Sequence, residues 1–143
     1  MKLKFLILVF IIPLGLFYAT SWQKVKAAEK LNLVINEVAW MGAENADIDP
    51  KNWWRYEWLE IYNNTPSAMN IDGWTIELYR SESDWLLNLK GEVPAQGYFL
   101  IVSSEKISAN YDLNYSNLGG KFNNSGQKIL LKHSTGAIID EID

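Results

Sequence analysis

The sequence predicts an all-β protein built around a two-sheet β-sandwich. Seven short apolar segments have the alternating or continuous hydrophobicity of strands, and turns rich in Gly, Pro and Asn separate them. The periodicity of an amphipathic helix is almost absent. The chain has 143 residues, of which 48% are hydrophobic and 21% are charged, and this is the length and composition of one globular domain.

The N-terminal segment differs from the rest of the chain. Two lysines at the start precede an apolar run at residues 5–20, and a polar stretch with small residues follows. This order is typical of a secretory signal peptide. Val25 and Ala27 place short side chains at the −3 and −1 positions of a cleavage site. We therefore expect residues 1–27 to be a signal segment and residues 28–143 to form the domain.

A membrane anchor is the alternative for this segment. An uncleaved chain would contact the membrane only through residues 5–20. That run is shorter than the ~20 residues that a spanning helix needs, and Pro13 and Gly15 interrupt it. Cleavage is therefore the favoured interpretation. With either outcome we expect a bacterial protein that is secreted or associated with the cell envelope.

The domain that follows Ala27 is acidic and has no cysteine. It contains nine basic and 17 acidic residues, a net charge of about −8. Such a domain repels phosphate backbones, so non-specific nucleic-acid binding is disfavoured. The lack of cysteine excludes thiol catalysis and cysteine-based zinc sites, and it fits a bacterial envelope better than a small disulfide scaffold.

The expected strands follow one another with one long interruption. They are residues 31–40, 56–64, 71–80, 84–91, 98–103, 128–133 and 137–143. Residues 98–103 are nearly all apolar and should form a buried central strand, whereas the last two segments flank a Ser-Thr-Gly turn as a hairpin. Residues 104–127 are long for a loop in a sandwich, so we expect them to contain a short strand or a helical turn.

Side-chain alternation predicts which residues of a strand face the core. In the first expected strand, one face carries Val34, Val38 and Trp40. In the third strand they are Trp74, Ile76 and Leu78. The tryptophans that lie within strands, and are therefore expected in the core, are Trp40, Trp58 and Trp74.

Glu57 and Glu60 raise the question of a catalytic pair of carboxylates. Residues three apart in a strand point to opposite faces, and at ~3.3 Å per residue these two lie about 10 Å apart with the sheet between them. A glycosidase pair must flank one bond from the same cleft, so these glutamates cannot form such a pair. A carboxylate on the core side needs hydrogen-bond donors, such as backbone N–H groups of a loop, and we expect this structural role.

Five pieces of the sequence, in order, resemble the lamin-tail domain in the form found in secreted bacterial proteins. They are LVINEVAWMG, EWLEIYNNT, IDGWTI, PAQGYFLIVS and NNSGQKILLKHSTGAIIDEI. The resemblance runs from about Leu31 to Asp143 and implies an immunoglobulin-like β-sandwich. It also implies a non-catalytic module, which in lamins binds protein partners and is implicated in DNA contact. In bacteria such modules occur in exported proteins and are often fused to hydrolases or nucleases.

The family's motif positions correspond to residues that we interpret as fold-defining. They are Asn36, Glu37, Glu57, Trp58, Glu60, Tyr62, Asn63, Gly73, Trp74, Ser125 and Gly126. The resemblance carries no active site.

The chain ends at Asp143 inside the last expected strand, where relatives usually continue. The two interpretations are a domain truncated at its C-terminus and a short edge strand.

Trp53, Trp54 and Arg55 form the strongest candidate binding site. Two adjacent tryptophans at the mouth of a strand can stack on sugars or insert into pockets of a protein partner. Alternation would direct one of them to the core and leave the other at least partly exposed. The alternative is that both pack, one of them into the core and the other over an open sheet edge.

Glu44, Asp47 and Asp49 lie in one loop and could begin a Ca²⁺ site, since this ion needs six or more oxygen ligands. The spacing is not that of an EF-hand, so solvated loop charge is the favoured interpretation and no cofactor is expected.

His133 is the only histidine. It follows a strand directly, no pattern pairs it with a serine or a metal, and we expect a surface residue rather than a catalyst.

We therefore expect a non-enzymatic interaction module that binds a protein or a surface glycan. A carbohydrate-binding module that uses Trp53 or Trp54 is one alternative. A docking accessory for a separately encoded secreted hydrolase or nuclease is another. An enzyme would need carboxylates from separate segments, such as Glu37 with Glu57 or Glu60, to meet in space, and a sandwich interior is a poor cleft for this.

Overall fold

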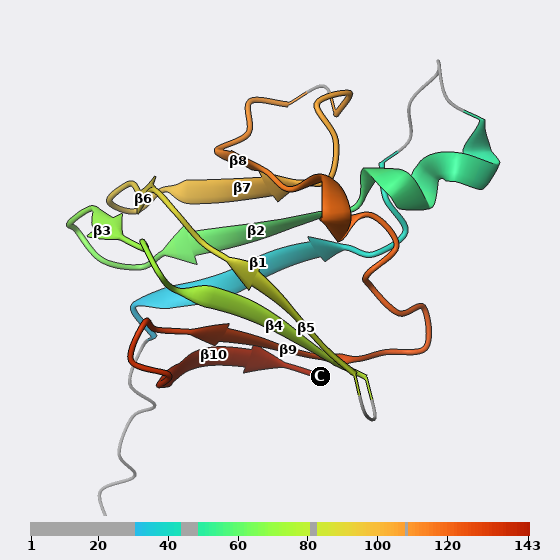
Figure 1. Cartoon of the computed structure of the whole chain (residues 1–143). Coiled ribbons are helices and arrows are strands. Elements are labelled where there is room, and N and C mark those ends of the chain that lie inside the picture. Colours follow the sequence, from blue (N-terminus) through green and yellow to red (C-terminus); the bar gives the residue numbers. More distant parts are fainter. Residues whose placement is uncertain (1–30, 44–48, 81–82, 108) are drawn as a thin grey trace, which may run out of the picture.

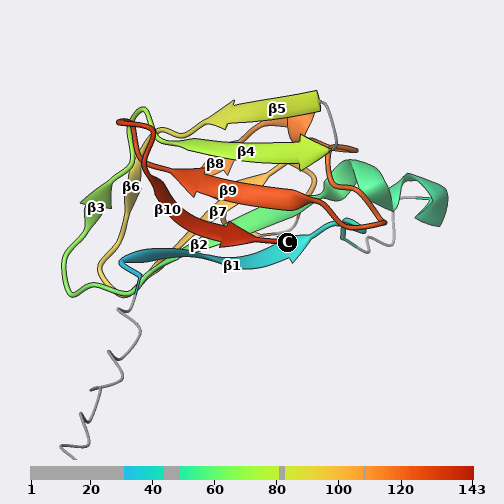
Figure 2. The same cartoon turned by 90° about the horizontal axis from the view of Figure 1, so that it is seen from below.

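The computed structural model describes residues 31–43, 49–80, 83–107 and 109–143. Two four-stranded sheets pack face to face, and a third sheet of two strands lies at one end of them (Figures 1 and 2). The described chain is therefore a two-sheet sandwich, as the segment pattern predicts. The signal segment expected at residues 1–27 lies outside the described residues.

The first sheet has the strand order β1-β2-β7-β8. Its strands are β1 (Leu33–Ala39), β2 (Trp58–Asn63), β7 (Tyr98–Val102) and β8 (Leu113–Asn114). The pairs β1–β2 and β2–β7 are antiparallel, and β7–β8 is parallel. β7 lies between two neighbours, which confirms the prediction of a central strand at residues 98–103.

The second sheet has the order β10-β9-β4-β5 and is antiparallel throughout. Its strands are β4 (Thr75–Arg80), β5 (Ser83–Asn88), β9 (Lys128–Lys132) and β10 (Ile138–Ile142). The predicted C-terminal hairpin is confirmed as β9–β10. The small third sheet pairs β3 (Met69–Asn70) with β6 (Glu92–Val93).

Two 3₁₀ helices complete the described chain. η1 spans Pro50–Tyr56 and η2 spans Ser116–Leu118. η2 and β8 lie within residues 104–127, so the short strand and helical turn expected there are both present. Within the part of the chain that the structure describes, no helix is long and apolar enough to span a membrane.

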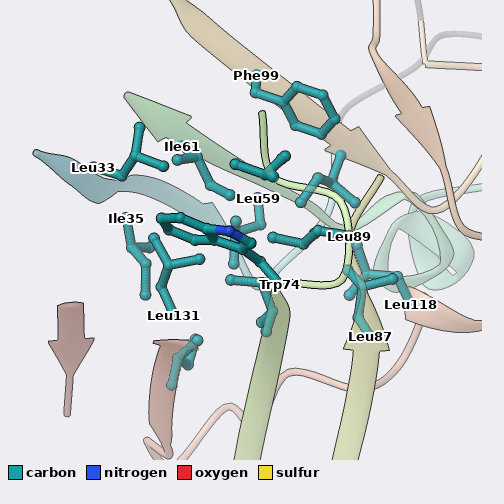
Figure 3. Packing of buried hydrophobic residues seen from close by; sticks show 14 of the residues in the cluster. Leu33, Ile35, Leu59, Ile61, Trp74, Leu87, Leu89, Phe99, Leu118 and Leu131 are labelled. Atoms are coloured by element: carbon teal, nitrogen blue, oxygen red, sulfur yellow. The ribbon is translucent and has the colours of Figure 1, made fainter. Parts of the chain in front are cut away.

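The core lies between the two large sheets. Leu59 and Ile61 of β2 face Ile76 of β4 and Leu131 of β9, and all four are almost completely buried. Figure 3 shows the Trp74 indole at the centre of this cluster. Each such side chain contributes roughly 1.5–3 kcal/mol on burial, so a core of this kind can hold the fold without disulfides.

The core face predicted for the first strand is partly wrong. Leu33 and Ile35 are the buried residues of β1, whereas Val34 is only half-buried and Trp40 is 42% exposed. A β-bulge lies between Ile35 and Glu37. Because a bulge adds one residue, the alternation reverses there, and Val38 packs against the same core as Leu33.

Of the tryptophans expected in the core, one is buried and another is not. Trp74 is 5% exposed and confirms its prediction. Trp58 is wrongly predicted as core, because it is half-buried and lies next to the buried Leu59, on the opposite face of β2.

Along one side of the sandwich the two sheets are connected by a side-chain hydrogen bond rather than by a ladder of backbone hydrogen bonds. β1 and β10 are outer strands of different sheets and run next to each other (Figure 2). The Ile35 N–H of β1 donates to Asp140 Oδ2 of β10 over 2.8 Å. This carboxylate satisfies an N–H group of an outer strand, which limits its use by a strand of another chain.

Candidate functional site

Glu57 is a structural carboxylate at the start of β2. It is 1% exposed, and its Oε2 accepts hydrogen bonds from the backbone N–H groups of Lys121 at 3.0 Å and Phe122 at 3.3 Å. Glu60 is half-buried and accepts from Asn36 Nδ2 at 2.7 Å. Burial and these donors hold Glu57 in the fold, so it is not available as half of a catalytic pair.

Asn63 closes the other end of β2. It is fully buried, and its Nδ2 donates to the carbonyls of Ser67 at 2.8 Å and Pro94 at 3.0 Å. Its Oδ1 accepts from the N–H and the hydroxyl group of Thr65. The side chain therefore joins two turns, and its role is to position backbone rather than to contact a ligand.

The contacts and conformations of Gly73 and His133 also indicate structural roles. Gly73 has φ +77, a conformation that favours glycine. His133 stacks edge-on against Trp74 with 4.8 Å between ring centroids, and its Nδ1 accepts from the Thr135 N–H at 3.1 Å. Nδ1 is therefore occupied by the β9–β10 turn, and His133 is half-buried at the end of β9.

The Trp53–Trp54 pair lies on a helix and not at the mouth of a strand. Both residues belong to η1, which begins at Pro50 after Asp49. Asp49 caps the helix, because its Oδ1 accepts from the Lys51 N–H at 3.0 Å. Strand alternation therefore does not decide which indole faces the protein, and that part of the prediction is wrong.

Helix geometry separates the two indoles. Trp53 is half-buried, and its Nε1 is buried without a hydrogen-bond partner among the described residues. Trp54 is 45% exposed. Its six-membered ring lies against Gly120, where an added Cβ would come within 3.0 Å of it. One indole packs and the other is presented to solvent.

Trp54 forms part of the wall of a cleft at the end of the sandwich where η1 lies (Figure 1). The cleft has a volume of about 430 Å³. Its lining residues come from η1 and from the loops that follow β7 and β8. They are Trp54, Arg55, Tyr56, Ser103, Ser104, Lys106, Ser116 and Gly119. We call this hollow the η1 cleft.

The η1 cleft combines aromatic, cationic and hydroxyl groups. Arg55 is exposed, and its Cζ lies 4.9 Å from the centroid of the Trp54 ring. Lys106 supplies a second cation from the loop after β7, and none of the described lining residues carries a carboxylate. Ser103 fixes the helix to the sheet, because its Oγ donates to the Arg55 carbonyl at 2.7 Å.

A metal site finds no support in the described residues. Glu44 and Asp47 of the candidate Ca²⁺ loop lie outside them, and the Asp49 carboxylate caps η1. Among the residues described, no three carboxylate or histidine groups gather closely enough to hold a metal ion.

A second hollow, of about 330 Å³, lies between β1 and the β9–β10 hairpin. Trp40, Phe122, Ile129 and Ile142 give it a largely apolar wall. Gln127 Nε2 is buried at this wall without a hydrogen-bond partner in the described chain. The hollow lacks the combination of aromatic and cationic groups found in the η1 cleft.

Sequence patterns did not single out most of the η1 cleft. Ser103, Ser104 and Lys106 come from the loop after β7, Ser116 begins η2, and the four have no shared spacing. One local signal was present for the helix itself, because an Asp directly before a Pro is typical of a helix start.

Comparison with known proteins agrees with this fold. The model of the family "Lamin Tail Domain" matches residues 26–143, which include the whole sandwich. A search of the curated proteins finds no match. The lamin tail domain is a non-enzymatic, immunoglobulin-like domain family. In this chain the side chains of Glu57, Asn63 and His133 make hydrogen bonds within the fold. The matched region covers most of the chain, and the chain therefore belongs to the lamin tail domain family.

Proposed function

We propose that this protein is an exported, non-catalytic binding module that holds a glycan of the cell surface in the η1 cleft. The observation that carries the proposal is the position of Trp54, which is 45% exposed at the wall of a hollow of about 430 Å³. Residues 1–27 would direct the chain to the envelope or the medium as a signal segment.

The chemistry of the cleft suits a sugar. An indole offers a flat apolar face to the C–H groups of a pyranose ring, and serine hydroxyls can both donate to and accept from sugar hydroxyls. Ser104 and Ser116 line the same cleft as Trp54. The volume is within the ~300–1,000 Å³ of small-ligand pockets, whereas a stable protein partner would cover about 800 Å² of a flatter surface.

Binding to the purified full chain tests this proposal. Insoluble cell-wall polysaccharide is mixed with the parent protein, with Trp54→Ala and with Tyr98→Ala. Tyr98 is 54% exposed at the opposite end of β7 from the cleft, so it controls for the loss of an exposed aromatic side chain. We expect retention of the parent and of Tyr98→Ala and loss of Trp54→Ala. Equal retention of all three would place the site elsewhere and overturn the proposal.

Export has a separate test. The chain is produced in a secreting bacterial host, and its N-terminus is determined by mass spectrometry. We expect the mature protein to begin at Ala28. An intact N-terminus on a membrane-bound chain would replace the signal peptide by an anchor and would leave the binding proposal in place.

A further inference from the structure

We infer that the η1 cleft selects an acidic polysaccharide, whose sugar ring packs against the exposed part of the Trp54 indole while its carboxylate pairs with Arg55. This inference rests on the proposed glycan binding and names the class of glycan. Two features of the described residues carry it, the arrangement of the Arg55 guanidinium and the distribution of charge around the cleft.

Arg55 is held in a geometry that leaves its donors available. Its guanidinium lies over the Trp54 ring, with Cζ 4.9 Å from the centroid. This contact is between the charge of the guanidinium and the ring, and it does not use the N–H groups in hydrogen bonds to an oxygen acceptor. Arg55 makes no ion pair within the described part of the chain. A planar fork of this kind binds a carboxylate through two parallel hydrogen bonds.

The backbone beneath Arg55 is fixed on two sides. Its carbonyl accepts from Ser103 Oγ at 2.7 Å, and Ser103 is buried. Its carbonyl also lies against Gly119, where an added Cβ would approach it to 3.0 Å. A side chain on a fixed backbone loses less conformational freedom when it binds, which favours affinity.

Charge around the cleft opposes the charge of the chain. The whole sequence has a formal net charge of −4, yet the described lining contributes Arg55 and Lys106 and no carboxylate. A local positive region in a concave site raises the concentration of anions there. A neutral sugar can accept hydrogen bonds from these cations but gains no charge attraction, whereas a uronate sugar carries the ring and the anion in one residue.

The chemical group that the cleft would recognise is an oxyanion on a polyhydroxylated chain. Besides a uronate, a phosphate group on a wall polymer would supply such an oxyanion. The test therefore measures binding of the full chain to three soluble probes by isothermal titration. They are polygalacturonate, its fully methyl-esterified form and poly(glycerol phosphate). The ester keeps the sugar rings and removes the charge. The phosphate polymer keeps the charge and removes the rings.

We expect polygalacturonate to bind roughly tenfold or more tightly than its methyl ester, since a hydrogen bond to a charged group is worth ~1.5–3 kcal/mol. Arg55→Gln should remove this preference, so that the acid and its methyl ester bind with similar affinity. Lys90→Gln deletes an exposed charge outside the cleft lining and should preserve the preference. Arg55 is exposed, so an unchanged melting temperature is expected and would confirm that its variant folds.

The remaining outcomes separate the two proposals. Equal binding of both pectin forms, lost from both in Trp54→Ala, would overturn the acidic preference and keep the glycan site. Binding that is indifferent to Trp54 would overturn both. An Arg55-dependent preference for poly(glycerol phosphate) over the two pectins would assign the oxyanion to phosphate and overturn the stacking of a uronate ring. Failure of all three probes to bind would overturn the acidic inference, and the cell-wall retention assay would then decide the glycan proposal independently.

Discussion

The carboxylate of Glu57 lies 3.0 Å from the backbone nitrogen of Lys121, although 64 residues separate them in the chain. The same oxygen accepts from the N–H of Phe122, whose side chain is part of the core. Glu57 thus attaches the loop before β9 to the start of β2. It also lies directly after Tyr56, the last residue of η1, so this attachment borders the proposed binding cleft.

Replacing Glu57 should destabilise the fold. Glu57→Ala leaves the Phe122 N–H without this acceptor, whereas the Lys121 N–H keeps the Leu118 carbonyl at 3.0 Å. We expect a loss of roughly 1–3 kcal/mol in the free energy of unfolding, the cost of one unsatisfied buried donor. Glu57→Gln keeps a carbonyl oxygen and should lose less. Urea unfolding followed by tryptophan fluorescence measures both. Glu60→Gln is the control, because Glu60 is half-buried and lies on the other face of β2, and it should change stability by less than ~1 kcal/mol.

Asn63→Asp should be more harmful than its change in size suggests. The Nδ2 group donates to the carbonyls of Ser67 and Pro94, and a carboxylate oxygen placed there would face those oxygens without a hydrogen to donate. The site is fully buried, so a charge there is strongly disfavoured. We expect a loss of at least about 3 kcal/mol by urea unfolding at pH 7. Burial raises the pKa of such a carboxyl, so a difference from the parent that shrinks as the pH falls from 7 toward 4 would identify the buried charge as its cause. A difference that stays constant over this range would contradict this explanation.

The set of strands could be predicted from sequence because each depends on local pattern. The seven strands of five or more residues in the described chain correspond to the seven apolar segments. The orientation of β1 could not be predicted, because the bulge after Ile35 leaves no mark in the residue types. The need of a core-side carboxylate for loop N–H donors could be predicted, but the identity of the donors to Glu57 depends on a loop that only the tertiary fold brings there.

The candidate site was predicted in part for a similar reason. Trp54 and Arg55 are adjacent in sequence, and their residue types indicated binding. The other lining residues Ser103, Lys106 and Ser116 come from the loop after β7 and from η2, so no spacing along the chain could connect them. The helix that carries Trp54 was missed because the aromatic run resembles a strand, although Asp49 and Pro50 are a helix start.

Glu77 on the outer face of the second sheet should make the free energy of unfolding depend on pH. Desolvation acts to raise the pKa of Glu77, but hydrogen bonds from Lys132 and Tyr79 and the charge of Lys132 outweigh it and lower the pKa below 4.5. A carboxyl with a lowered folded pKa stabilises the fold at pH values above its unfolded pKa. That contribution is lost as the pH falls through the folded value. We therefore expect the free energy of unfolding to decrease on acidification below about pH 4.5.

Lys132→Met tests the origin of this effect. The variant removes the cation and leaves the desolvation, so the pKa of Glu77 should rise and the decrease on acidification should shrink or reverse. Urea unfolding from pH 3 to pH 7 measures the difference between parent and variant, which should be largest at pH 7. Lys128→Met is the control, because Lys128 and its partner Glu141 are both well exposed and such pairs contribute little. An equal effect of the two substitutions would contradict the role of Glu77.

Gly42→Ala should impair the η1 cleft through the backbone. Gly42 has φ +80, and an added Cβ would lie 1.8 Å from the Trp53 carbonyl oxygen, so η1 must move to make room. Gly136→Ala is the matched control, because Gly136 has φ +87 and no atom within 4 Å of the added Cβ. Both variants carry the strain of a left-handed residue, about 1–2 kcal/mol, and only Gly42→Ala adds the clash. We expect Gly42→Ala to lose more stability, to shift the tryptophan emission and to weaken retention on cell-wall polysaccharide. Retention equal to that of Gly136→Ala would mean that the position of η1 does not govern binding, and the ligand would then have to contact another part of the sandwich.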